Sequence, residues 1–339
     1  MKKTLVALAV AALTATSANA AVVYNQDGTK LDINGSVRVL LDKNTDKRTD
    51  LKNDESQINF AASQDLGNGL SAVGYLRLKV EGENFNELKV NKLYAGLAQE
   101  GIGTLTFGRQ DTNADEVQLA DYTYHYGDDG NYYGKSTLKT ENEKGIKFRS
   151  AEFAGFSFGA DYGFSQNVSK TNGKQNLNNF GVAMFYTANF ADNVTLNVNA
   201  GYTQEKVVDV RKNNAEINGK EKAWLTAAEV VTGPVSLAVS YGQVKNTAVD
   251  KKLKKLVVGA KYQVTDVAKV YTQYQHNSYD KRNSRNAHNL NSFTVGAGYL
   301  LHKNVETFVE FGRQNKIVFN GVEKRQNQNK VGAGFRVFF

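Results

Sequence analysis

Acidic and aromatic side chains are concentrated between Asp111 and Glu143, in a segment without a regular hydrophobic pattern. Its first half carries four carboxylates, which are Asp111, Asp115, Glu116 and Asp121. A connection this long without secondary structure is uncommon within a folded domain and is usually either functional or disordered. Carboxylates gathered on one flap can coordinate a metal ion, or they can face basic groups across a narrow gap and create an electric field there.

Basic side chains occur on both sides of this segment, on runs whose polarity alternates with a period of two. The residues that fall on the polar face of such runs are Arg38, Arg77, Lys79, Lys147 and Arg149. Arg109 shares its parity with Leu105 and Phe107, so it needs a bulge or a strand end to turn the same way. Opposed charges across a water-filled gap orient polar solutes and disfavour apolar ones. We therefore predict a pore constriction between these six basic residues and the four loop carboxylates.

Other chemistries are less well supported by these residue types. Asp128-Asp129-Gly130 suggests a calcium loop, but the ligand spacing of an EF-hand is absent. The histidines show no metal-ligand spacing and no nucleophile context, so we predict no catalytic residue, no metal site and no cofactor. The loop tyrosines are Tyr122, Tyr124, Tyr126, Tyr132 and Tyr133. They could guide sugars, but packing of the flap against a wall is the favoured interpretation.

The elements that must hold these residues are strands. In Val194–Thr203, for example, Val, Leu, Ala and Tyr alternate with Thr, Asn and Gly. Such alternation predicts a strand with one apolar and one polar face. Several apolar faces end in an aromatic residue, as lipid-facing bands do at the membrane interfaces. The sixteen predicted strands lie near 31–41, 55–64, 70–81, 88–98, 104–110, 144–151, 156–164, 177–189, 194–205, 221–231, 235–245, 253–264, 267–277, 288–300, 305–315 and 327–339.

Short and long connectors alternate between these strands, which predicts an up-and-down meander. An even number of strands allows the first and the last to close antiparallel, so that no open edge faces lipid. The fold class is therefore all-β, a 16-stranded antiparallel transmembrane β-barrel. Its third long loop is the acidic segment, about 111–143, and we expect it to fold inward.

The ends and the composition restrict the compartment. Lys2 and Lys3, the apolar run Leu5–Leu13 and the Ala18-Asn19-Ala20 site predict a cleaved signal peptide over 1–20, leaving one barrel domain over 21–339. The chain has no cysteine, which excludes a disulfide-stapled module. The net charge of +8 is scattered singly, so no nucleic-acid partner is expected.

Several motifs resemble those of the Gram-negative general-diffusion porins. They are Asp65–Leu70, Lys92–Leu97, Phe107-Gly108-Arg109, Gly145–Arg149, Phe156–Tyr162 and the terminal Phe339. The start Ala21-Val-Val-Tyr24 is most similar to the major porins of the Haemophilus/Pasteurella group. The resemblance covers essentially the whole chain after residue 20.

The resemblance implies an inward third loop that faces a ladder of Arg38, Arg109 and Arg149. The arginine of the family's second strand is Gln57 here, so Arg77 or Lys79 is expected to substitute. The family's Pro-Glu-Phe-Gly-Gly loop signature is absent, which leaves the acids of the constriction open among Asp115, Glu116 and Asp121. The resemblance also implies a homotrimer, and a Phe339 that is read by the barrel-assembly machinery. The implied partners are outer-membrane lipid, lipopolysaccharide and small hydrophilic solutes.

The expected function is passive diffusion of small hydrophilic solutes and ions across the outer membrane of a Gram-negative bacterium, after export through the general secretory pathway. A channel specific for a sugar or an anion is the alternative. An outer-membrane barrel enzyme and a soluble exported binding protein or adhesin are further ones. The basic majority on the lumen faces favours anions, whereas the acidic loop opposes that preference at the narrowest point.

Overall fold

The computed structural model describes residues 21–45, 47–81, 85–127, 137–164, 177–210, 216–248, 250–279, 288–319 and 323–339. The predicted signal peptide lies outside these residues, as do Asp128, Asp129, Tyr132 and Tyr133. No helix in the described ranges is long and apolar enough to cross a membrane.

Alternation of residue types produces strands whose apolar face points outward. In the strand that contains both residues, Val239 is 43% exposed whereas Ser240 is 1% exposed. This arrangement is the reverse of a soluble sheet, and it is what a lipid-facing outer surface requires. The polar inner faces then surround the lumen.

Sixteen of the eighteen strands in the described chain form the barrel wall, which confirms the predicted fold class. They are β2 (Thr29–Asn44), β4 (Gln57–Gly67), β5 (Leu70–Glu81), β6 (Glu87–Gln99), β7 (Gly103–Asp111), β8 (Glu141–Ser150), β9 (Phe156–Gly163), β10 (Asn179–Ala191), β11 (Val194–Val210), β12 (Glu216–Thr232), β13 (Val235–Asn246), β14 (Lys251–Thr265), β15 (Ala268–Tyr279), β16 (His288–His302), β17 (Val305–Phe319) and β18 (Glu323–Phe338). Consecutive wall strands pair antiparallel, and β18 closes the barrel on β2, from Lys330 opposite Asn44 to Phe338 opposite Ser36.

Two short strands were not predicted. β1 (Ala21–Gln26) pairs with the beginning of β2, where Ala21 lies opposite Ile33. Phe339 exchanges backbone hydrogen bonds of 2.8 and 3.0 Å with Gly35, so β1 continues the line of β18 along β2. β3 (Asp50–Asn53) lies in the first long loop and also pairs with β2. Both ends of the chain after residue 20 therefore complete the same seam of the barrel.

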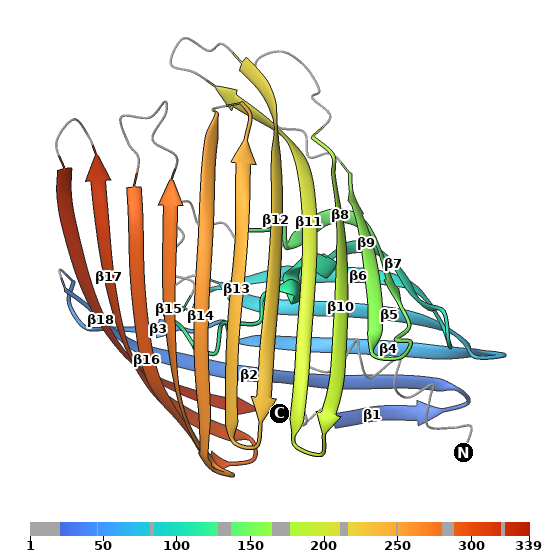
Figure 1. The fold of residues 1–339 in the computed structure, drawn as a ribbon. Helices are drawn as coiled ribbons and strands as arrows, with labels where there is room; N and C mark the ends of the chain where they lie inside the picture. Colours follow the sequence, from blue (N-terminus) through green and yellow to red (C-terminus); the bar gives the residue numbers. More distant parts are fainter. Residues whose placement is uncertain are drawn as a thin grey trace.

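Tight turns lie at one end of the barrel and the longer connections at the other, and β11 and β12 extend beyond their neighbours at the loop end (Figure 1). Outer-membrane barrels have short periplasmic turns and long extracellular loops, which assigns the loop end to the cell exterior. The third long loop does not follow the others outward. It enters the lumen through a short 3-10 helix, η1 (Asn113–Val117), between β7 and β8.

Candidate pore constriction

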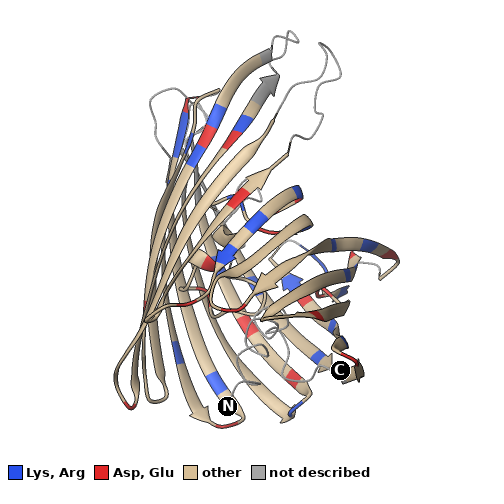
Figure 2. Ribbon diagram, turned by 90° about the vertical axis from the view of Figure 1, so that its right-hand side faces the viewer, with Lys and Arg blue, Asp and Glu red and all other residues tan. Residues whose placement is uncertain are grey.

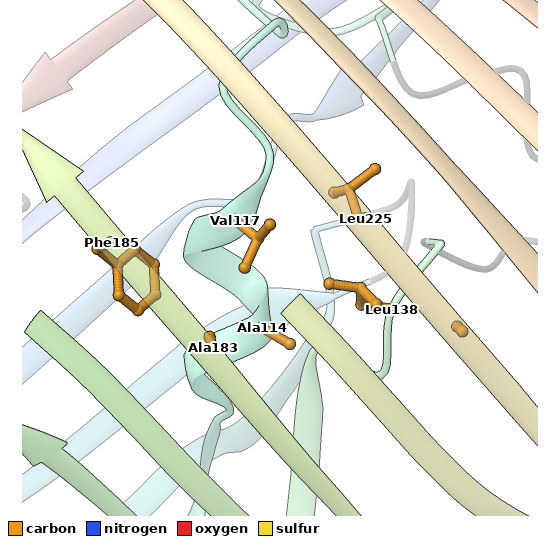
Figure 3. Packing of buried hydrophobic residues seen from close by; sticks show 7 residues of the cluster. Ala114, Val117, Leu138, Ala183, Phe185 and Leu225 are labelled. Atoms are coloured by element: carbon orange, nitrogen blue, oxygen red, sulfur yellow. The ribbon is translucent and has the colours of Figure 1, made fainter. Parts of the chain in front are cut away.

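A small hydrophobic core inside the barrel holds the third loop against the wall. Ala114 and Val117 on η1, with Leu138 on the returning limb, pack against Phe185 of β10 and Leu225 of β12 (Figure 3). Further along, Ala120 packs against Ala238 and Val257 on β13 and β14. The three-residue spacing from Ala114 to Ala120 presents successive small side chains to the wall.

Glycines on the inner wall make room for this contact. A Cβ at Gly201 would lie 2.9 Å from Val117, and one at Gly259 would lie 2.2 Å from the backbone oxygen of Ala120. Under Tyr126, Gly312 and Gly332 play the same part. The glycine-rich polar faces suggest a water-filled lumen. They also form the surface on which the loop packs.

Replacing Gly259 by valine should lift the loop from the wall, because no side chain fits beneath Ala120. Overpacking of this kind costs about 1–3 kcal/mol. We expect faster amide hydrogen exchange in residues 114–122 of G259V. Gly74 provides the control, since a Cβ there meets nothing within 4 Å. Unchanged exchange in G259V would contradict the close packing of the loop.

Three alternate tyrosines attach the next part of the loop to wall carboxylates. Tyr122 donates a 2.6 Å hydrogen bond to Glu229, Tyr126 donates one of 2.5 Å to Asp42, and Tyr124 contacts Glu306. Their rings also receive cations, since Lys261 lies 5.1 Å from the centroid of Tyr122 and Lys269 lies 4.5 Å from that of Tyr124. These three tyrosines therefore pack the loop against the wall, which is the interpretation that the sequence favoured.

Glu310 on β17 is the central anchor of the loop tip. Its carboxylate accepts hydrogen bonds from the backbone N–H groups of Tyr124, His125 (3.0 Å) and Tyr126 (2.9 Å), and from the Tyr271 hydroxyl (2.8 Å). Successive N–H groups that converge on one acceptor form an anion-binding nest. Sequence reasoning missed this residue, although two carboxylates on the polar face of 305–315, Glu306 and Glu310, are a visible signal.

Asp54 of the first long loop joins the same anchor. It forms a 2.6 Å ion pair with Arg336 of β18 and a 3.1 Å contact with the Nδ1 atom of His125. Burial alone would raise the pKa of Asp54, but the hydrogen bond from His125 and the charge of Arg336 hold that pKa below its usual range. The loop tip is thus fixed at the seam between β18 and β2, on the side of the lumen opposite its start.

The described part of the loop follows the inner wall from β9 to β18, and the remaining arc from β2 to β8 carries the basic residues. These are Arg38 on β2, Arg77 and Lys79 on β5, Lys92 on β6, and Lys147 and Arg149 on β8. The strand register shows that these side chains point inward. Asn59 is 1% exposed on the inner face, and it lies opposite Asn34, on the face of β2 that carries Arg38, and opposite Arg77. The uncovered wall therefore carries these six cations, whereas further cations on the covered wall, among them Lys261, Lys269 and Arg336, contact the loop or its anchor.

Several of these cations already have carboxylate partners. Glu116 lies 3.0 Å from Arg149 and 3.8 Å from Lys147. Asp111 forms an ion pair with Lys92, and Glu55 forms one of 2.7 Å with Lys79.

Arg38 and Arg77 differ, because no carboxylate lies within ion-pair distance of either in the described residues. Arg38 donates to Ser36 at 2.9 Å, and Arg77 donates to Asn59 at 2.8 Å and to the Tyr75 hydroxyl at 2.9 Å. Two arginines whose charge is not neutralised therefore face the open part of the lumen.

The remaining loop acids lie beside a side cavity. Asp115 and Asp121 line a space of about 230 Å³ between the loop and the wall, together with Lys255. Asp115 is exposed to this space, yet the surrounding barrel removes part of its hydration and raises its pKa, against the opposing charges of Lys92 and Lys147. Both amide atoms of Gln275 lack a protein partner among the described residues, as expected of a water-filled space.

Arg109 departs from the sequence prediction. A bulge between Gly108 and Gln110 is present, but Arg109 lies opposite Leu93, which is 56% exposed on the outer face. Its guanidinium pairs with Glu141 at 2.9 Å. Strand partners that lie directly opposite share a face, so Arg109 belongs to the outer rim and not to the lumen wall.

Lys92 takes the place that sequence reasoning assigned to Arg109. The register of β5 and β6 shifts between Arg77 and Leu78, so that Asn91 is an extra residue and Lys92 turns inward, opposite Arg77. Parity counted across Asn91 is therefore misleading. Within the described ranges, no group of three or more His, Asp or Glu residues is placed to hold a metal ion.

Comparisons with known proteins agree with this architecture. A profile described as Gram-negative porin matches residues 7–316. A major outer membrane protein of Pasteurella multocida (strain Pm70) is 44% identical over 366 residues, covering 100% of both chains. Among solved structures, in-vitro folded OmpT of Vibrio cholerae gives a TM-score of 0.73 at 21% identity, covering 94% of this chain and 99% of that one. An anion-selective porin from Comamonas acidovorans gives 0.72 at 16% identity, covering 92% and 100%.

Proposed function

Because this chain belongs to the Gram-negative porin family and is a channel protein of the outer membrane, we propose that it passes small hydrophilic solutes and ions by passive diffusion. The family and the names of its relatives indicate a channel rather than an enzyme. We further propose that no catalytic step accompanies transport. Solutes cross between the loop and the uncovered arc from β2 to β8.

The observation that carries this proposal is the division of the lumen. The loop covers one wall through its hydrophobic core and its tyrosines, so the aqueous path lies along the other wall. That path has Arg38 and Arg77 on one side and the loop acids Asp115 and Glu116 on the other. Charges that face each other across a low-dielectric passage orient dipolar solutes and bias the passage of ions.

Planar-bilayer recording of the purified protein tests the proposal. We expect stepwise, ohmic conductance, and solute flux that follows size and charge without saturation. Saturation by one sugar or one anion would instead support a substrate-specific channel. A folded protein that gives no conductance steps would contradict the channel path described above.

Assembly and biogenesis are part of the same proposal. One solved form of Vibrio cholerae OmpT is described as a trimer. We propose a homotrimer for this chain, cleavage of residues 1–20, and recognition of Phe339 during barrel assembly. The backbone pairing of Phe339 with Gly35 supports its place at the closing seam.

A further inference from the structure

The side cavity beside the third loop contains buried polar atoms that have no hydrogen bond within the described chain. Its volume is about 230 Å³, and it lies between the loop and the wall strands β12, β14 and β15. Both amide atoms of Gln275, which is 1% exposed, and the Oε1 atoms of Gln273 and Gln118 lack a partner among the described residues. Gln273 donates from its Nε2 atom to the backbone oxygen of Gly127 at 2.7 Å, which identifies Oε1 as the acceptor that is left. The cavity therefore offers more hydrogen-bond acceptors than donors to a ligand.

Strand register places apolar, basic and amide side chains next to one another on the wall of this cavity. Leu225 of β12, Gly242 of β13 and Lys255 of β14 form one row across the inner wall. Val257 shares the face of Lys255 and lies directly opposite Gln275 of β15. Neighbouring strands are about 4.8 Å apart and alternate residues of one strand about 7 Å apart, so this wall measures about 10 by 7 Å. A surface of this size fits one small solute molecule.

The cavity carries both signs of charge. Asp115 and Asp121 line it from the loop, and Lys255 lines it from the wall. Lys255 is 6% exposed and takes part in an interaction within the chain, but an ammonium group has three N–H donors and can also donate to a ligand. Figure 2 shows acidic and basic positions interspersed on the barrel, and the cavity is one place where the two signs face each other. A simple cation or anion would be attracted by one of these groups and repelled by the other.

The apolar part of the lining is aliphatic. Leu138 of the returning limb and Leu225 of β12 lie next to each other (Figure 3), and Val257 continues this surface on β14. Among the described lining residues there is no aromatic ring on which a sugar can stack. The cavity thus combines an ammonium group, two carboxylates, glutamine amides and an aliphatic surface. A ligand that carries both charges and a short hydrocarbon chain matches all four.

We propose that this cavity binds one aliphatic amino acid in its zwitterionic form. Lys255 and the Nε2 atom of Gln275 donate hydrogen bonds to the carboxylate of the ligand. The ammonium group of the ligand donates three hydrogen bonds, which go to the loop carboxylates and to the glutamine Oε1 atoms. Its hydrocarbon chain packs on Leu138 and Val257, which removes apolar surface from water. The site lies on the covered wall of the lumen, opposite the proposed solute path.

Isothermal titration of the purified, detergent-solubilised protein with L-leucine tests the proposal. We expect saturable binding of one leucine per chain. Isoamylamine lacks the carboxylate of leucine, and 4-methylpentanoate lacks its ammonium group. Each should bind at least about tenfold more weakly than leucine, because each loses hydrogen bonds to charged groups. Equal binding of either analogue, tighter binding of glucose, or no saturable binding of leucine would overturn the proposal.

Two pairs of matched variants locate the bound leucine. Lys254 and Lys255 are neighbours on β14, but Lys254 is exposed whereas Lys255 lines the cavity. K255M should weaken leucine binding at least about tenfold, and K254M should bind like the unmodified protein. Q275L should weaken binding about tenfold, and Q243L should not, because Gln243 lies opposite the exposed Trp224 on the outer face. Q275L should also fold normally, since it replaces a buried amide that has no protein hydrogen bond in the described chain.

Equal leucine affinity of K255M and K254M, or of Q275L and Q243L, would place the ligand elsewhere and contradict the proposed site. Circular dichroism and the electrophoretic mobility of unheated samples show whether each variant is folded. Saturating leucine should not block the single-channel current, because the proposed solute path follows the other wall. A block of the current by leucine would instead place the ligand in that path and overturn the cavity site. The titration does not require conductance, so failure of the channel function and failure of this site are distinguishable.

Discussion

The E310Q variant should release the tip of the third loop and increase single-channel conductance. Glu310 is 3% exposed and accepts hydrogen bonds from three consecutive backbone N–H groups of the loop and from Tyr271. A hydrogen bond to a charged group contributes about 1.5–3 kcal/mol. Loss of the charge should therefore weaken the anchor by about 3 kcal/mol, which raises the population of the detached tip about a hundredfold. Planar-bilayer recording would detect larger and more frequently fluctuating steps.

E229Q is the graded control for this experiment. Glu229 also contacts the loop from the inner wall, but within the described part of the loop it accepts only one hydrogen bond, from Tyr122, and a second comes from Asn197 on the wall. Its replacement should have a much smaller effect on conductance. If E310Q and E229Q both recorded like the unmodified protein, the tip would be held by other contacts and Glu310 would not be its anchor.

The barrel was predictable because every wall strand repeats the same two-residue pattern, and closure requires no information beyond the order of the strands. β3 was not predictable in this way, because its four residues lie inside a polar connector. They form a strand only because the folded connector places them beside β2. Lys92 was missed and Arg109 was wrongly expected in the lumen, for different reasons. The extra residue Asn91 turns Lys92 inward, and the sequence around it does not mark that position. Arg109 keeps the outer face of Leu105 and Phe107, because the bulge beside it does not turn it inward.

The path of the loop depends on contacts between segments far apart in the chain. The sequence predicted that the acidic segment folds inward. In the structure, the first part of the loop contacts β9 and its tip is held by Glu310 and Arg336. The spacing of Ala114, Val117 and Ala120 and the glycines of the inner faces were both visible in the sequence. Their correspondence could be recognised only after the barrel had brought the two surfaces together.

This arrangement separates the anchor of the loop from the surface that solutes meet. Carboxylates of the covered wall are engaged by loop hydroxyl and N–H groups, and most cations of the uncovered wall are engaged by nearby acids. Arg38 and Arg77 are the exceptions among the described residues. The ion preference of the pore should therefore depend on these two arginines more than on the total number of basic residues in the lumen.

Replacing both arginines, as in R38Q/R77Q, should shift selectivity toward cations. A unit charge acts on an ion at contact distance with about 1 kcal/mol in water, which is about a fivefold change in local ion concentration per arginine. We expect the ratio of cation to anion permeability, measured as a reversal potential in a salt gradient, to rise by that order. D115N/E116Q should move the reversal potential in the opposite direction.

R109Q separates this explanation from a simple effect of net charge. It removes one positive charge as R38Q does, but from the outer rim, where Arg109 pairs with Glu141 beside the exposed Leu93. Its reversal potential should equal that of the unmodified protein. A shift in R109Q as large as that in R38Q would mean that Arg109 reaches the aqueous path, and the register of β6 and β7 would then have to differ from the one described. The two single variants therefore test the inner wall and the outer rim in one measurement.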